Sequence, residues 1–124
     1  MKKVLVAEDS SVIQNLTKKI LQFQNFDIKS VKNGKEVLKS MESDTYDLIL
    51  MDINMPQMDG MTCIREIRSM TDKTKSSIPV IAISGNAKNY SEEDFISAGF
   101  NEFLAKPLDF DKLVETVKKL TDTK

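Results

Sequence analysis

The chain has 124 residues, of which 40% are hydrophobic and 30% are charged, and its formal net charge is -1. These values predict one soluble domain over residues 1–124 without direct binding to nucleic acid or membranes, since there is no basic excess and no apolar run near the roughly 20 residues that span a bilayer. The lack of histidine excludes histidine-based triads, the usual transition-metal sites and histidine kinase activity within the chain. The single cysteine, Cys63, excludes an internal disulfide and favours a reducing, cytoplasmic location.

The first quarter of the chain predicts a strand, a helix and a second strand. Residues 3–7 form a short apolar run, which is typical of a strand buried on both faces. Ser10 or Ser11 is expected to cap the helix that follows, because a serine hydroxyl accepts a hydrogen bond from the amides of a first helical turn. Residues 26–31 alternate between apolar and polar and predict a half-exposed strand. The helix is expected to bury the apolar residues of one face, which are Ile13, Leu16 and Ile20.

The middle of the chain repeats this alternation. Asn33 and Gly34 mark a turn before a short helix, and residues 47–51 predict a second buried strand. A loop with Pro56 and Gly60 then leads into another helix. The residues expected to face inward are Val37, Leu38 and Met41 in the first of these helices and Met61, Ile64 and Ile67 in the second.

The last third of the chain completes the pattern. Residues 80–83 predict a third buried strand, and the acidic segment 91–94 is suited to start a helix that Gly99 ends. Residues 102–105 predict a short last strand, and Asp109 begins the terminal helix. The inward residues of that helix are Phe110, Leu113, Val117 and Leu120.

Five strands that alternate with five helices predict an α/β fold with helices on both faces of a parallel sheet. Polar residues follow four of the expected strands, at the point where each strand ends. Glu8 and Asp9 follow the first strand, and Asp52 follows the second buried strand. Ser84 and Lys106 follow the last two strands. Because parallel strands end at one edge of a sheet, we expect these side chains to gather where ligands bind in such folds.

The chemistry of this group favours a magnesium-assisted phosphoryl transfer. Neighbouring carboxylates repel one another, and a hard divalent cation relieves that conflict. Asp9 and Asp52 are the best candidate Mg²⁺ ligands, with Glu8 in support. Lys106 offers a positive charge and Ser84 a hydroxyl donor to a phosphoryl group. The Asp52 carboxylate is the candidate nucleophile, because carboxylates form acyl phosphates.

Each of these residues also has a purely structural interpretation. Glu8 and Asp9 are suited to cap a helix, and Asp52 is suited to a loop before a proline. Ser84 is suited to a turn, and a lysine such as Lys106 is usually a solvated surface residue. The joint placement at one edge of the sheet favours the functional interpretation over separate structural ones.

Five segments extend the pattern over nearly the whole chain. They are Glu8-Asp9-Ser10, residues 48–60 around Asp52, residues 79–87 around Ser84, residues 98–100, and residues 103–108 around Lys106-Pro107. In this order they resemble the segments of response-regulator receiver domains of two-component signalling, of the chemotaxis-receiver type and either stand-alone or attached to hybrid kinases. The resemblance implies a flavodoxin-like fold with five parallel strands in the order 2-1-3-4-5 and five helices on both faces.

The resemblance also implies roles for individual residues. Asp52 would accept a phosphoryl group from a phosphohistidine on a sensor histidine kinase or a histidine phosphotransfer protein. Asp9, Asp52 and the backbone carbonyl of Asn54 would bind Mg²⁺. Lys106 would contact the phosphoryl oxygens, and the bond from Lys106 to Pro107 would be cis. Ser84 and Phe103 would form the switch, in which Ser84 bonds the phosphate and the Phe103 ring follows it toward the core.

The chain departs from the family pattern at a few positions. Ser84 stands where many members have threonine, which keeps the hydroxyl and loses a methyl group. Phe103 stands where some have tyrosine and lacks the hydroxyl that an outward ring would use. Asn54 and Asn86 lie near the expected phosphoryl group and are expected to influence its hydrolysis.

Four other classes fit the sequence less well. A hydrolase of the haloacid dehalogenase type needs an acid where Asn54 stands, and a calcium loop starting at the same aspartate fails at Pro56 and at Cys63. A flavodoxin-type cofactor protein conflicts with Glu8-Asp9, which would repel a phosphate in the absence of a cation. A degenerate receiver that binds partners without phosphorylation is disfavoured because no expected site residue is missing.

No output domain is expected after the final helix, so the signal should pass to a downstream protein or to a phosphotransfer histidine. Residues 54–60 and 84–87 look more like receivers of hybrid kinases, which favours a relay. Met55 and Met58 are either core residues or exposed docking residues, and Cys63 is expected in the interior of the third helix.

Overall fold

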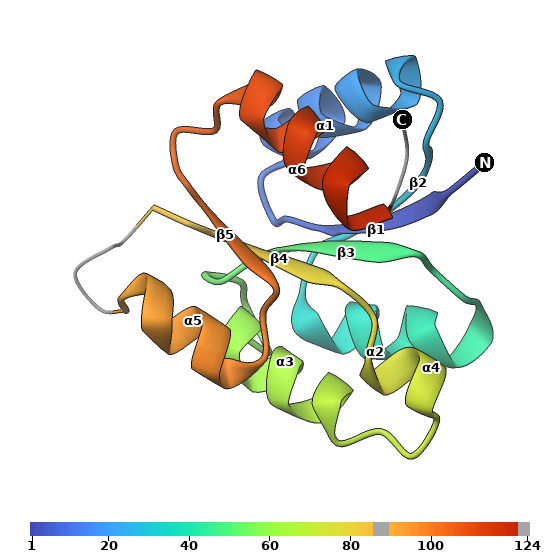
Figure 1. The fold of residues 1–124 in the computed structure, drawn as a ribbon, viewed down its shortest axis with the longest axis vertical. Helices are drawn as coiled ribbons and strands as arrows, with labels where there is room; N and C mark the ends of the chain where they lie inside the picture. Colours follow the sequence, from blue (N-terminus) through green and yellow to red (C-terminus); the bar gives the residue numbers. More distant parts are fainter. Residues whose placement is uncertain (86–89, 122–124) are drawn as a thin grey trace.

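The computed structural model describes residues 1–85 and 90–121, and this part of the chain contains five strands and six helices, two of which follow one another between the third and fourth strands (Figure 1). The strands are β1 (Lys3–Ala7), β2 (Asp27–Val31), β3 (Leu48–Asp52), β4 (Val80–Ser84) and β5 (Glu102–Ala105). The helices are α1 (Ser11–Phe23), α2 (Gly34–Ser43), α3 (Gly60–Arg68), α4 (Lys73–Ser76), α5 (Glu92–Ala98) and α6 (Phe110–Thr121).

The strands form one parallel sheet in the order β2-β1-β3-β4-β5, which confirms the predicted topology. Every residue of β3 and β4 is buried, because these strands lie inside the sheet and are covered on both faces. The two edge strands are less buried: β2 alternates exposed and partly buried residues, and β5 has one buried residue, Leu104, and ends in an exposed one. The continuously apolar runs of the sequence therefore mark the inner strands.

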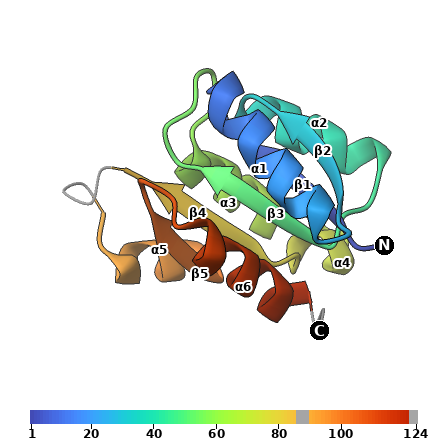
Figure 2. The same ribbon diagram turned by 90° about the horizontal axis from the view of Figure 1, so that it is seen from above.

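Helices cover both faces of the sheet, as predicted. Figure 1 shows α1 and α6 on one face and α2, α3, α4 and α5 on the other, and Figure 2 shows α1 and α6 lying over the strands. The core accordingly has two parts. One part contains Leu21 of α1 and Leu113 and Val117 of α6. The other contains Val37 of α2, Ile64 of α3 and Phe95 of α5. No helix in the described ranges has the length and apolar character needed to cross a membrane.

The prediction of five helices was wrong by one short helix. The additional helix, α4, has four polar residues and no buried one, so it carries no apolar period that a sequence pattern could detect. Asp72 stabilises it locally, because its Oδ1 accepts hydrogen bonds from the backbone amides of Thr74 and Lys75.

The inward face of α1 also differs from the prediction. Leu16 is exposed, at 44% of its full surface, and Ile13 and Ile20 are half-buried. The fully buried residues of this helix are Gln14, Thr17 and Leu21. The buried face of α1 is therefore rotated about the helix axis from the predicted one, and it includes the polar side chains of Gln14 and Thr17.

Arg68, the last residue of α3, ties three connections together. Its guanidinium group donates to the backbone oxygens of Ser76, Ile78 and Gly99 and to the Asn101 side chain, at 2.7–3.1 Å. Gly99 has a φ of 120°, and a Cβ there would lie 2.9 Å from Cγ of Arg68. These five hydrogen bonds use every N–H donor of the guanidinium group, so Arg68 fixes the ends of α3, α4 and α5 relative to one another.

Candidate functional site

Three carboxylates meet at the C-terminal edge of the sheet, and we call the group of Glu8, Asp9 and Asp52 the acidic notch. One carboxylate oxygen from each residue lies within 4.8 Å of the others. Asp52 ends β3 and is 1% exposed, whereas Glu8 and Asp9 follow β1. Glu8 is buried at 6% exposure and Asp9 is exposed. The structure thus brings together the three acids that the sequence placed at strand ends.

Lys106 supplies the positive charge of the acidic notch. Its Nζ donates a hydrogen bond of 2.8 Å to Oδ2 of Asp52 and lies 3.8 Å from Oε2 of Glu8. Lys106 follows β5, and its backbone amide donates to the carbonyl of Ser84 at 3.0 Å, which fixes the start of its side chain beside β4. The bond from Lys106 to Pro107 is cis, as the resemblance implies.

The notch holds more negative charge than Lys106 balances. Burial raises the pKa of Glu8 to about 8, and the hydrogen bond with Asp52 and the charge of Asp52 act in the same direction. Burial lowers the pKa of Lys106, but the hydrogen bond to Asp52 and the nearby acids outweigh it, so the pKa rises above its ordinary value. A proton or a further cation is therefore favoured between the acids.

The loop after β3 is held by backbone contacts. The amide of Asn54 donates to Oδ1 of Asp52 at 3.1 Å, and the Asn54 side chain is exposed. The amide of Gly34 donates to the carbonyl of Met58 at 3.0 Å, and a Cβ at Gly34 would lie 2.7 Å from that oxygen. Gly60 closes the loop, since its amide donates to the carbonyl of Ile53 at 2.9 Å. Small residues at these two positions let the loop lie close to the notch.

The two expected switch residues lie on neighbouring strands. Ser84 is the last residue of β4, is 3% exposed and pairs in register with Ala105 of β5. Phe103 lies on β5, is half-buried and stacks on Phe95 of α5 with ring centroids 4.8 Å apart. Asn86, which we expected near the phosphoryl group, and Ala87 lie outside the described residues.

Sequence reasoning missed one polar residue that contacts the site. The buried side chain of Gln14 donates to the backbone carbonyl of Glu8 at 3.1 Å. The sequence offers no local signal for this role beyond a polar residue next to the apolar positions that were expected to face inward. Of the two methionines considered for docking, Met55 is buried at 8% exposure and Met58 is half-buried, so the docking role is wrong for Met55. Cys63 is fully buried in α3, as predicted, and burial raises the pKa of its thiol to about 12.

The donor set of the notch fits Mg²⁺. The three acids offer oxygen ligands within reach of one ion, and three carboxylates beside a single lysine leave negative charge that a divalent cation would relieve. A buried carboxylate with a lysine at hydrogen-bonding distance is also suited to accept a phosphoryl group, whose charge spreads over its oxygens.

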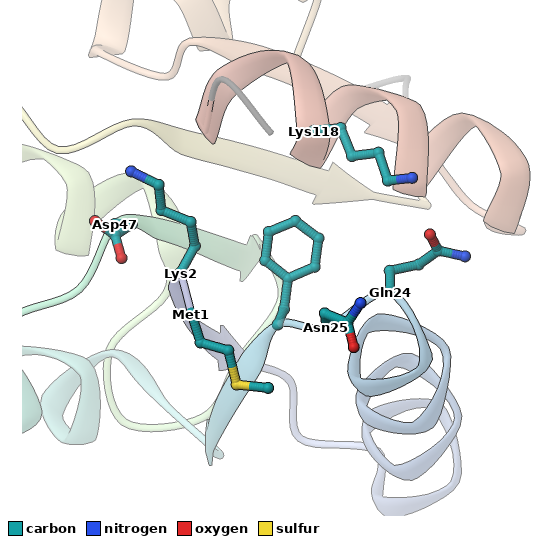
Figure 3. Close-up of a pocket in the computed structure, with 7 residues that line it drawn as sticks. Met1, Lys2, Gln24, Asn25, Asp47 and Lys118 are labelled. Carbon is teal, nitrogen blue, oxygen red and sulfur yellow. The ribbon is translucent and has the colours of Figure 1, made fainter. Parts of the chain in front are cut away.

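A different pocket lies at the opposite edge of the sheet, where the strands begin. Figure 3 shows residues that line it, and most precede β1, β2 or β3 or end α1. They are Met1, Lys2, Gln24, Asn25, Phe26, Asp47 and Lys118. None of them belongs to the predicted site, so the notch and this pocket are separate features.

The parallel sheet with an acidic notch at the C-terminal ends of its strands defines the class of phosphoacceptor signalling domains. A model of the response regulator receiver domain matches residues 4–118, and the chain belongs to this family. Over 98% of its length it is 36% identical to hybrid signal transduction histidine kinase M of Dictyostelium discoideum. It spans 5% of that kinase and no more than 20% of the curated relatives considered.

Solved structures show the same fold. The receiver domain of a sensor histidine kinase from Pseudomonas aeruginosa, with a magnesium ion in its active-site cleft, has a TM-score of 0.87 and 30% identity, and 98% of each chain is covered. The response regulator protein TrrA from Thermotoga maritima, in complex with Mg²⁺-BeF, has a TM-score of 0.83 and 35% identity. In that comparison 97% of this chain and 99% of TrrA are covered.

Proposed function

We propose that residues 1–124 act as one receiver domain in which Asp52 accepts a phosphoryl group from a phosphohistidine, in a Mg²⁺-dependent reaction. The observation that carries this proposal is the Asp52 carboxylate, which is buried at the end of β3, hydrogen-bonded to Lys106 and within 4.8 Å of two further acids. The Mg²⁺-BeF complex of the similar protein TrrA supports a magnesium site of this kind.

The chain's own groups would position the reaction. A carboxylate oxygen of Asp52 attacks the phosphorus atom, the bond from phosphorus to the donor imidazole nitrogen breaks, and its electron pair stays on the imidazole. The amide of Asn54 holds Oδ1 of Asp52 and so fixes the orientation of the carboxylate. The Lys106 ammonium group, which has three donors, balances the charge on the phosphoryl oxygens.

The proposed metal ligands are acids of the notch and one backbone carbonyl that the resemblance to receiver domains implies. Asp9, Asp52 and the backbone carbonyl of Asn54 would hold Mg²⁺, and Glu8 would support them from its buried position beside Asp52. When bound, the ion supplies positive charge to the carboxylates and to the phosphoryl oxygens. Deprotonation of Glu8 is then favoured, because the excess negative charge of the notch is compensated.

The signal would pass from the phosphate to a protein surface. The Ser84 hydroxyl would bond the phosphoryl group, and the Phe103 ring on the adjacent strand would reposition with it. The donor would be a sensor histidine kinase or a histidine phosphotransfer protein, and the output a downstream protein or a phosphorelay, without direct contact to nucleic acid or membranes. The domain would also catalyse its own dephosphorylation. We place the domain in the cytoplasm, because the free thiol of Cys63 fits a reducing compartment.

The test is labelling with acetyl phosphate, a small phosphodonor, followed by intact-protein mass spectrometry. We expect a mass increase of one phosphoryl group that requires Mg²⁺, is lost in Asp52→Asn and persists in Asp27→Asn, which removes an exposed acid of β2. No labelling of the parent chain, or labelling that survives Asp52→Asn, would refute the proposal.

A further inference from the structure

We infer that Gln14 is a positioning residue for the metal site, an inference that rests on the proposed function. Its side chain is 8% exposed, although it sits on the inward face of α1 where an apolar residue would be the ordinary choice. Burying an amide group is unfavourable unless its polar atoms are hydrogen-bonded. The partners of this amide therefore explain why a glutamine stands here.

Both donors of the Gln14 amide are used, and both go to strand ends. Nε2 donates to the carbonyl of Val31, the last residue of β2, at 2.8 Å and to the carbonyl of Glu8 at 3.1 Å. The assignment of nitrogen to this position follows from its partners, because an oxygen there would face two carbonyl oxygens. Gln14 thus joins the end of β2 to the segment that carries the first two acids.

The backbone of the segment that Gln14 holds is tied to the end of β2. Glu8 follows the last residue of β1, and its amide donates to the carbonyl of Val31 at 3.0 Å. Gln14 completes this arrangement, so that the amide and the carbonyl of Glu8 are both tied to neighbours. Fixing this backbone aims the Glu8 and Asp9 side chains at Asp52, and metal sites depend on such outer contacts for ligand orientation.

Two variants separate positioning from general packing. Gln14→Met keeps the length and the helix propensity of the side chain and removes both donors. Thr17→Val is the matched control, because Thr17 is the next buried polar residue on the same face of α1, one turn further from the notch. Gln14→Asn is a milder second variant, because its shorter side chain cannot reach both carbonyls, and it decides the question if Gln14→Met does not fold.

Two measurements are made on each folded variant. In metal-free protein, we expect the Glu8 amide to exchange with deuterium several-fold faster in Gln14→Met, since a hydrogen bond that holds its segment is lost. In a Mg²⁺ titration followed by NMR, we expect binding to weaken by about tenfold, the lower end of the effect of outer contacts on metal affinity. Thr17→Val should match the parent chain in both.

The inference is overturned if Gln14→Met binds Mg²⁺ as tightly as the parent, or if Thr17→Val weakens binding equally. A parent chain that takes up no Mg²⁺ would instead refute the proposed function. The exchange rate of the Glu8 amide, measured without metal, still decides in that case whether Gln14 holds the segment.

Discussion

Mg²⁺ binding at the acidic notch should depend steeply on pH, because the ion competes with a proton on Glu8. Burial and the neighbouring Asp52 raise the pKa of Glu8 to about 8 in the metal-free chain. A carboxyl group with that pKa is ionised in about one molecule in a hundred at pH 6 and in about half of the molecules at pH 8. If Mg²⁺ binds the ionised form, its apparent affinity should rise about fiftyfold from pH 6 to pH 8 and about twofold from pH 8 to pH 9.

The same proton sets the pH dependence of stability in the metal-free chain. The folded chain keeps a proton on Glu8 up to about pH 8, whereas the unfolded chain loses it near the ordinary pKa of 4.5. The contribution to stability is therefore fully present below pH 4.5 and is lost as the pH rises through 8. If Mg²⁺ binds the folded chain as proposed, saturating Mg²⁺ should offset this loss.

The assay is isothermal titration calorimetry with Mg²⁺ between pH 6 and pH 9, in buffers of different ionisation enthalpy that count the protons released. Glu8→Gln is the control, and its affinity should be nearly independent of pH. The chain has no histidine, the side chain whose ordinary pKa would place its titration in the same range. An affinity of the parent chain that stays flat from pH 6 to pH 8 would refute the reasoning.

Three further predictions test other parts of the structure. Arg68→Lys should lower the free energy of unfolding measured in urea by about 1–3 kcal/mol, because an ammonium group cannot replace the five hydrogen bonds of the guanidinium group. The control is Arg65→Lys at an exposed position, which should change the free energy of unfolding by no more than about 0.5 kcal/mol. Lys106→Ala should still be labelled by acetyl phosphate but show smaller NMR shift changes at Phe103 on labelling, and unchanged shifts would remove Lys106 from the switch. Gly34→Ala should lower the melting temperature measured by circular dichroism, because its Cβ would lie 2.7 Å from the Met58 carbonyl oxygen and the β3–α3 loop would have to move. A melting temperature equal to that of the parent chain would show that the loop moves without cost.

The strands could be predicted from the sequence because of where they lie in the sheet. β3 and β4 are buried on both faces, so nearly all their residues are apolar and each strand stands out in the sequence as a continuous apolar run. Their order in space left no comparable mark, and it came from the resemblance to a family. The short α4 was missed for the opposite reason, since a helix that buries nothing is specified by its cap at Asp72 and not by a period.

The membership of the acidic notch was predictable, but its electrostatics were not. Parallel strands end at one edge, so acids that follow β1 and β3 had to meet there. Glu8 and Asp9 are adjacent in sequence, yet one is 6% exposed and the other faces solvent. Which acid is buried depends on what covers each side of the β1 end, and burial is the main cause of the raised pKa of Glu8.

The error in the inward face of α1 has the same origin as the role inferred for Gln14. We chose apolar residues for that face, although the helix covers a place where the backbone carbonyls of Glu8 and Val31 need donors. A leucine at position 14 would remove the amide donor from the Glu8 carbonyl and leave the Val31 carbonyl with the Glu8 amide alone. Removing a hydrogen-bond partner from a buried polar group costs more than the added apolar contact of a leucine would return. The requirement arises from two strand ends that lie 23 residues apart in the chain, so no local pattern in α1 expresses it. In α1 the polar residue beside the expected apolar stripe is therefore explained by the two carbonyls at the strand ends and not by the packing of the helix.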